Sequence, residues 1–160
     1  MRRIWAPWRR QYLQNCLDTG CFLCEILHAD DDKKNLVLLR TSSLYVVMNK
    51  YPYTNGHLMI VPNHHTGSLD ELSSEVRAEC FEMTNQTIQW LTQAINPQGF
   101  NVGMNIGKVA GAGLESHLHI HVVPRWTGDA NFMTTVHQTR VISESLEEAY
   151  QRIIEVIPKE

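Results

Sequence analysis

Three histidines stand at every second position in the stretch ESHLHIHVVPRW, at His117, His119 and His121. Residues two apart on a β-strand point to the same face, so the three imidazole rings are predicted to share one face. The apolar residues between them then point to the other face, beneath a helix. Aligned imidazoles suit a functional site better than a core. They indicate either a chelated metal or a middle ring, His119, that acts as a nucleophile or base.

A glycine-rich loop, GKVAGAG, precedes the histidines along the chain. Gly107, Gly111 and Gly113 allow backbone N–H groups to approach a ligand closely, and successive N–H groups form a nest that binds anions. Ser116, immediately before the first histidine, can donate a hydrogen bond to phosphate. A phosphate-binding loop beside a row of imidazoles indicates phosphoryl or nucleotidyl transfer, with His119 attacking phosphorus.

Two cysteines separated by two residues, Cys21 and Cys24, are interpreted as a redox pair, half of a zinc site or a pair of packed thiols. A redox motif of the thioredoxin type requires a preceding strand–helix–strand unit, which the sequence lacks. Tetrahedral zinc requires two more ligands, and the PNHH segment and His117 can provide them. If no metal binds, His117 instead bonds to the backbone.

The elements that must position these residues alternate between strands and helices. Strands are predicted over residues 35–40, 44–49, 57–62, 100–107 and 117–124. A capping box of Ser68 and Glu71 is predicted to start one long amphipathic helix that ends at Asn96-Pro97, and residues 146–157 form a closing helix. Short links between neighbouring strands favour an α+β fold, an antiparallel sheet with both helices packed on one face.

Composition restricts the class of protein. The chain has 160 residues, 19% of them charged, and a formal net charge of −3, which indicates one globular domain over residues 1–160. That charge argues against nucleic acid or a membrane as partner. The basic, tryptophan-containing start of the chain is predicted to form a short helix. It lacks the apolar run of a signal peptide, and no segment is long enough to cross a bilayer, so we expect a cytoplasmic protein.

The histidine row and its surroundings resemble a known family. Residues 117–123 fit the His-φ-His-φ-His-φ-φ signature of the histidine triad (HIT) superfamily of nucleotide hydrolases and transferases. NKYPYTNGHLMIVP resembles its upstream strand-turn-strand and NIGKVAGAG its phosphate loop, so the similarity covers a core of about residues 20–125. WAPWR and HVVPRWTGDANFM resemble the prokaryotic diadenosine tetraphosphate phosphorylases, also described as ATP adenylyltransferase-like.

This resemblance implies a HIT-like fold and a role for several residues. By this resemblance we expect His119 to attack the α-phosphorus of a nucleoside polyphosphate and form a nucleotidyl-histidine, which phosphate or water then resolves. We expect His121 to hydrogen-bond near the transferring phosphate, and His57 to line the same pocket. Asn49 matches a position that contacts the ribose hydroxyls, and Asn105 matches one that contacts phosphate.

The resemblance also implies a metal site and a base site. It implies a structural zinc, with no organic cofactor. Its four ligands match Cys21, Cys24, His65 and His117. Apolar side chains of the early strands hold the base in the family, and the candidates are Leu44, Val46 and Ile60.

One departure from the family concerns the acceptor. Many relatives carry a glutamine after the Ala-Gly of the phosphate loop, whereas Ala112 and Gly113 follow here. Small residues at this point favour inorganic phosphate over water. We therefore expect an enzyme that converts diadenosine tetraphosphate and phosphate to ATP and ADP. The family resemblance also implies a homodimer. The alternatives are a hydrolase of dinucleoside polyphosphates or adenosine phosphoramidates, a non-catalytic nucleotide-binding protein, and a triad that itself holds zinc.

Overall fold

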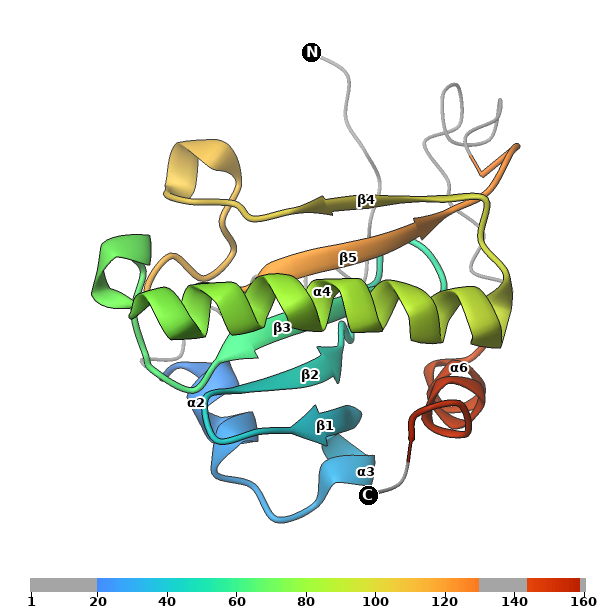
Figure 1. Cartoon of the computed structure of the whole chain (residues 1–160), viewed down its shortest axis with the longest axis horizontal. Coiled ribbons are helices and arrows are strands. Elements are labelled where there is room, and N and C mark those ends of the chain that lie inside the picture. Colours follow the sequence, from blue (N-terminus) through green and yellow to red (C-terminus); the bar gives the residue numbers. More distant parts are fainter. Residues whose placement is uncertain (1–19, 130–143, 159–160) are drawn as a thin grey trace.

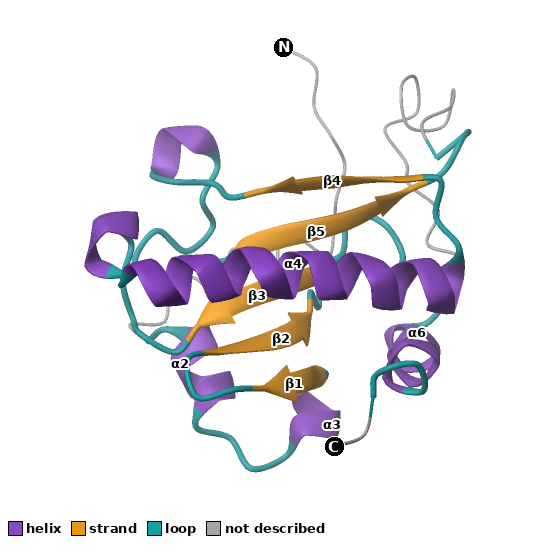
Figure 2. Cartoon of the chain, in the orientation of Figure 1, coloured by secondary structure: helices purple, strands orange, loops and turns teal. Residues whose placement is uncertain are grey.

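Five antiparallel strands form one sheet in the computed structural model, which describes residues 20–129 and 144–158 (Figures 1 and 2). The strands are β1 (Val37–Arg40), β2 (Leu44–Met48), β3 (Leu58–Pro62), β4 (Gly99–Gly103) and β5 (Ile120–Arg125). Their order across the sheet is β1-β2-β3-β5-β4. The predicted antiparallel α+β fold is confirmed. The last two predicted strands are shorter than expected, so His117 and His119 lie just before β5.

The long helix α4 (Ser74–Ile95) crosses one face of the sheet (Figure 1). The predicted capping box is wrong, because the Ser68 side chain makes no cap bond and bonds to Asp70 instead. A 3₁₀ turn follows (Leu69–Glu71), and extended backbone at Leu72 separates it from α4. Ser73 caps α4 by accepting a hydrogen bond from the backbone N–H of Val76. The helix ends at Asn96, as predicted, in a left-handed conformation.

The main core lies between the sheet and two helices, α4 and α6 (Leu146–Ile154). Two of the three apolar residues that alternate with the histidines, Ile120 and Val122, belong to this core, whereas Leu118 is buried outside it. Ile120 and Val122 therefore lie beneath a helix, as the alternation predicted.

The long and the closing helix share one face, as predicted, and a smaller helix that the prediction did not place covers part of the opposite face. Leu23 and Ile26 of α2 (Phe22–Leu27) pack with Tyr45, Val47 and Met59 of the sheet. All residues of β2 and β3 are buried because both faces of these strands are covered. A one-turn helix, α3 (Asp32–Asn35), connects α2 to β1.

Some sequence predictions concern residues that the structure does not describe. The predicted N-terminal helix with its tryptophans lies outside the described residues. Within residues 20–129 and 144–158, no helix combines the length and apolar character that crossing a membrane requires. The homodimer stays a prediction. β4 lies at an edge of the sheet, and its Val102 is about half exposed.

Candidate active site and metal-ligand cluster

The histidine row divides into two groups in the structure. The rings of His119 and His121 lie 4.8 Å apart between centroids, and His57 lies 5.1 Å from His121. The ring of His117 instead lies 5.0 Å from His65. Pairing of β3 with β5 brings His57, directly before β3, close to His121. Three histidines thus form one cluster, and the first member of the row belongs to another.

A chain of hydrogen bonds fixes the proton positions on two of these rings. The backbone N–H of Tyr53 donates to Nδ1 of His57, at 3.1 Å, so the His57 proton is on Nε2. That Nε2–H donates to Nδ1 of His121, at 3.0 Å. His121 therefore carries its own proton on Nε2. The two rings form a relay that begins at a backbone amide and ends at the His121 N–H donor.

The proton of His119 is placed on Nδ1, because the partner of this nitrogen is an acceptor and not a donor. Its Nδ1 lies 2.9 Å from the carbonyl oxygen of His117, which can only accept, so Nδ1 carries the proton. Nε2 of His119 then has an available lone pair. A neutral imidazole held in this way is a nucleophile with a defined direction of attack.

Burial keeps the relay uncharged. Burial, with neighbouring His121 and His119 as smaller causes, lowers the pKa of His57 to about 3. Burial and the neighbouring His119 lower the pKa of His121 to about 4. Burial also lowers the pKa of His119, although the hydrogen bond to the His117 carbonyl opposes this. The ring of Tyr53 stacks on His57, with centroids 4.8 Å apart, and helps to shield it from water.

A second cluster joins Cys21, Cys24, His65 and His117. Nε2 of His117 donates to the Pro62 carbonyl, at 2.8 Å, which leaves the Nδ1 lone pair to face the thiols. This Nδ1 lies 3.3 Å from Sγ of Cys21 and 3.5 Å from Sγ of Cys24. Nδ1 of His65 lies 3.2 Å from Sγ of Cys24.

The cluster has the dimensions of a tetrahedral metal site. Its four ligand atoms all lie within 4.8 Å of one another. Zinc bonds of about 2.0 Å to nitrogen and about 2.3 Å to sulfur place neighbouring ligand atoms roughly 3.5 Å apart. Two thiols and two imidazoles are also a usual donor set for zinc. The residues present therefore fit a zinc ion with all four positions filled.

His117 connects the two clusters. Its side chain faces the two thiols through Nδ1, and its backbone carbonyl accepts a hydrogen bond from Nδ1–H of His119. The ring is fully buried. A group that holds the His117 side chain therefore also holds the carbonyl that orients His119.

The predicted phosphate loop connects β4 to the histidine row. Gly107 (φ 81°) and Gly111 (φ 90°) flank a 3₁₀ turn (Lys108–Ala110) in conformations that favour glycine. Gly113 and Ser116 are exposed, and Asn105 is half-buried before the turn. Asn49 lies in the turn after β2, where its Oδ1 accepts a hydrogen bond from the N–H of Tyr51, at 2.8 Å.

The three residues predicted to grip the base lie elsewhere. Leu44, Val46 and Ile60 are fully buried in the core beneath α4, on the face opposite to the histidines, so they do not fit that role. Met59 lies on the histidine face and is the cross-strand partner of His121. Period-two alternation along β3 places Met59 on this face, because it is two residues from His57, and Met59 is buried there against α2.

Comparison with known proteins agrees with this geometry. The HIT domain family model matches residues 31–128, more than half of the chain. This chain belongs to the HIT family. The HIT protein is similar to the AP-4-A phosphorylase of Mycobacterium tuberculosis, with 38% identity over 155 residues, covering 91% of this chain and 79% of the relative.

Two further HIT relatives bear on the site. The adenosine 5'-monophosphoramidase hnt1 of Schizosaccharomyces pombe is 28% identical over 106 residues, covering 66% of this chain and 74% of the relative. A crystal structure of a Zn-bound histidine triad family protein from Mycobacterium smegmatis has a TM-score of 0.64 and 25% identity, covering 85% of this chain and 91% of that one.

Proposed function

We propose that this HIT protein is a nucleotidyltransferase that cleaves diadenosine tetraphosphate with inorganic phosphate to give ATP and ADP. The observation that carries the proposal is the lone pair on Nε2 of His119, which follows from the Nδ1 hydrogen bond to the His117 carbonyl. His121, 4.8 Å away between ring centroids, provides a neutral N–H donor. Similarity to a relative named AP-4-A phosphorylase supports the choice of substrate.

The first step forms the covalent intermediate. Nε2 of His119 attacks the α-phosphorus, a nitrogen–phosphorus bond forms, and the bond from phosphorus to the bridging oxygen breaks. ATP leaves, and AMP remains on His119. The ring gains positive charge as it bonds to phosphorus, and the His117 carbonyl on Nδ1–H stabilises that charge. The Nε2–H of His121 is available to stabilise the negative charge on the phosphoryl oxygens.

The second step returns the enzyme to its starting state. An oxygen of inorganic phosphate attacks the same phosphorus, and the bond to His119 breaks. AMP and phosphate combine to ADP, and Nε2 recovers its lone pair. The N–H groups of the glycine-rich loop, at Gly111 and Gly113, are candidates to hold the phosphate groups, with Ser116 and Asn105 beside them. Asn49 is the candidate for the ribose.

The choice between phosphate and water as acceptor has a direct test. With diadenosine tetraphosphate and radiolabelled phosphate, we expect equal amounts of ATP and ADP, with the label in the β-phosphate of ADP. Without phosphate, turnover should fall to background. Formation of ATP and AMP at a rate independent of phosphate would contradict phosphorolysis and establish a hydrolase.

A second candidate activity uses the same nucleophile. Similarity to adenosine 5'-monophosphoramidase supports hydrolysis of adenosine phosphoramidates, in which the leaving group is an amine and water is the acceptor. The ratio of kcat/KM for diadenosine tetraphosphate to kcat/KM for adenosine 5'-monophosphoramidate separates the two activities. A protein that binds both nucleotides and converts neither would instead be a nucleotide-binding module.

We also propose that Cys21, Cys24, His65 and His117 hold a structural zinc. Two thiolates and two imidazoles at these distances support the proposal, as does similarity to a Zn-bound HIT protein. When bound, the zinc would fix the His117 side chain. His117 would in turn hold its carbonyl against Nδ1 of His119.

Metal analysis of three proteins tests whether this cluster, and not the histidine triad, holds the zinc. Wild type and His119→Ala are expected to contain one zinc per chain, because His119 lies outside the cluster. Cys21→Ser should lose most of the metal, since removal of one of four ligands weakens zinc binding strongly. Loss of zinc in His119→Ala would instead indicate that the triad itself holds the metal.

A further inference from the structure

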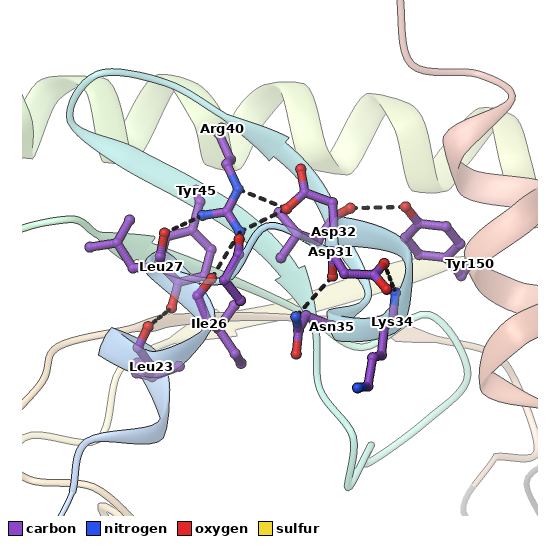
Figure 3. A network of polar contacts seen from close by, with 12 residues as sticks. Leu23, Ile26, Leu27, Asp31, Asp32, Lys34, Asn35, Arg40, Tyr45 and Tyr150 are labelled. Atoms are coloured by element: carbon purple, nitrogen blue, oxygen red, sulfur yellow. Dashed lines mark hydrogen bonds and ion pairs between the residues drawn. The ribbon is translucent and has the colours of Figure 1, made fainter.

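The helix that carries the cysteines is held at its C-terminal end by one side chain from the sheet. The guanidinium of Arg40, at the end of β1, donates to the carbonyls of Ile26 (2.8 Å), Leu27 (2.9 Å) and Ala29 (3.3 Å) (Figure 3). Its Nε also donates to Asp32, at 2.8 Å. The last carbonyls of a helix have no partner within the helix and form the negative end of its dipole. Arg40 therefore caps α2.

A second side chain of the same hairpin holds the other end of α2. The hydroxyl of Tyr45, on β2, donates to the carbonyl of Leu23 at 2.8 Å, and this tyrosine is fully buried. The guanidinium of Arg40 lies 5.7 Å from the centre of the Tyr45 ring, in a cation–π arrangement (Figure 3). The β1–β2 hairpin thus contacts α2 at both of its ends.

These anchors matter because α2 is too short to be stable alone. It has six residues, fewer than two turns, and isolated helices shorter than about 12 residues are marginal in water. Cys21 is its N-cap residue, and Cys24 is its third residue. The position of α2 against the sheet therefore sets where both thiols lie relative to His117, which comes from a different part of the chain.

We propose that Arg40 is a positioning residue for the metal-ligand cluster. By capping α2 on the sheet, Arg40 holds Cys21 and Cys24 beside Nδ1 of His117. Three of the four zinc ligands are then close together before the metal binds. This inference rests on the zinc site proposed above. Among the described residues, Arg40 forms no hydrogen bond with the four ligand side chains, and its bonds to the carbonyls of Ile26 and Leu27 connect it to the backbone of α2.

The test compares two arginines that hold helix ends. Arg152 forms an ion pair with Glu144 and donates to the carbonyl of Ala94 near the end of α4, far in sequence from the cysteines. Zinc affinity is measured on full-length protein by competition with a chromophoric chelator, at a temperature where circular dichroism shows each variant folded. We expect Arg40→Met to weaken zinc binding at least tenfold, by analogy with residues that orient metal ligands. Arg152→Met should stay within about twofold of wild type by the same argument.

Two further variants separate positioning from a general loss of stability. Arg40→Lys keeps the charge but loses the planar fork that reaches several carbonyls, so its zinc affinity should fall between those of wild type and Arg40→Met. Tyr45→Phe removes only the hydroxyl that bonds to Leu23 and should also weaken zinc binding, because it loosens the same helix. Wild-type affinity in Arg40→Met, or in Arg40→Lys if Arg40→Met fails to fold, would overturn the proposal.

A metal-independent measurement keeps this test distinct from the zinc proposal itself. In chelator-treated protein, the amides of Glu25 and His28, which bond within α2, should exchange hydrogen faster in Arg40→Met than in wild type or Arg152→Met. Equal exchange rates would contradict the role of Arg40 in holding α2. Absence of zinc binding by the wild type would refute the zinc site, and the exchange rates would still decide whether Arg40 positions the thiols.

Discussion

Replacement of His119 by alanine is expected to lower kcat for diadenosine tetraphosphate cleavage by about 10⁴-fold or more, as loss of a covalent nucleophile does in other enzymes. Among the described histidines of the active-site cluster, His119 alone has its Nδ1–H bonded to a carbonyl and its Nε2 lone pair available. His57 and His121 are bonded to each other. The covalent intermediate provides the decisive measurement. Wild type quenched during turnover should carry acid-labile, radiolabelled AMP, and His119→Ala should carry none.

The matched control for this variant is His64→Ala. His64 is an exposed histidine next to the metal-ligand cluster and lies outside the active-site cluster. Its replacement should leave kcat within about twofold of wild type, because exposed substitutions away from a site have small effects. An unchanged rate of substrate loss in His119→Ala would remove the nucleophile assignment, whatever His64→Ala does.

Replacement of His57 by leucine is expected to lower kcat by about 10²-fold to 10³-fold, the range seen when one donor to a transition state is lost. Leucine cannot donate to Nδ1 of His121, so the His121 proton is no longer confined to Nε2. His57→Gln keeps an N–H of similar reach and should recover part of this loss. Equal activity of the leucine and glutamine variants would contradict the relay from Tyr53 through His57 to His121.

The same residue should control acid stability. The folded protein takes up the His57 proton only near pH 3, whereas the unfolded chain takes it up near the ordinary pKa of 6.5. As the pH falls through this window the unfolded state binds more protons, so the free energy of unfolding falls by about 1.4 kcal/mol per pH unit. Between pH 6.5 and 4.5, the free energy of unfolding measured with urea should fall by about 2–3 kcal/mol more for wild type than for His57→Gln. Parallel declines would show that His57 titrates normally.

Local patterns in the sequence determined much of the fold. Period-two alternation predicted the strands and placed the apolar partners of the histidines beneath a helix, because a side chain on a strand has only two faces available. The end of the long helix at Asn96 was also predictable, since Pro97 cannot continue a helix. Its start was not, because Ser68 and Ser73 are both plausible caps and the extended backbone at Leu72 decides between them.

Tertiary structure decided the chemistry of the site. The spacing of the histidines left the three imidazoles equivalent, and the structure gives them different partners that are distant along the chain: Pro62 for His117 and His57 for His121. It also decided which face of β2 and β3 lies beside the histidine cluster, and Leu44, Val46 and Ile60 lie on the other face.

The physical reason is the same in each case. Spacing along the chain determines which side chains can lie on the same face of an element. For the histidines and the cysteine pair, the sequence by itself was enough to predict this. Which nitrogen of a ring carries its proton depends on the acceptor that packing brings to it. Arg40 illustrates the same limit, because its role exists only once β1 lies beside the end of α2.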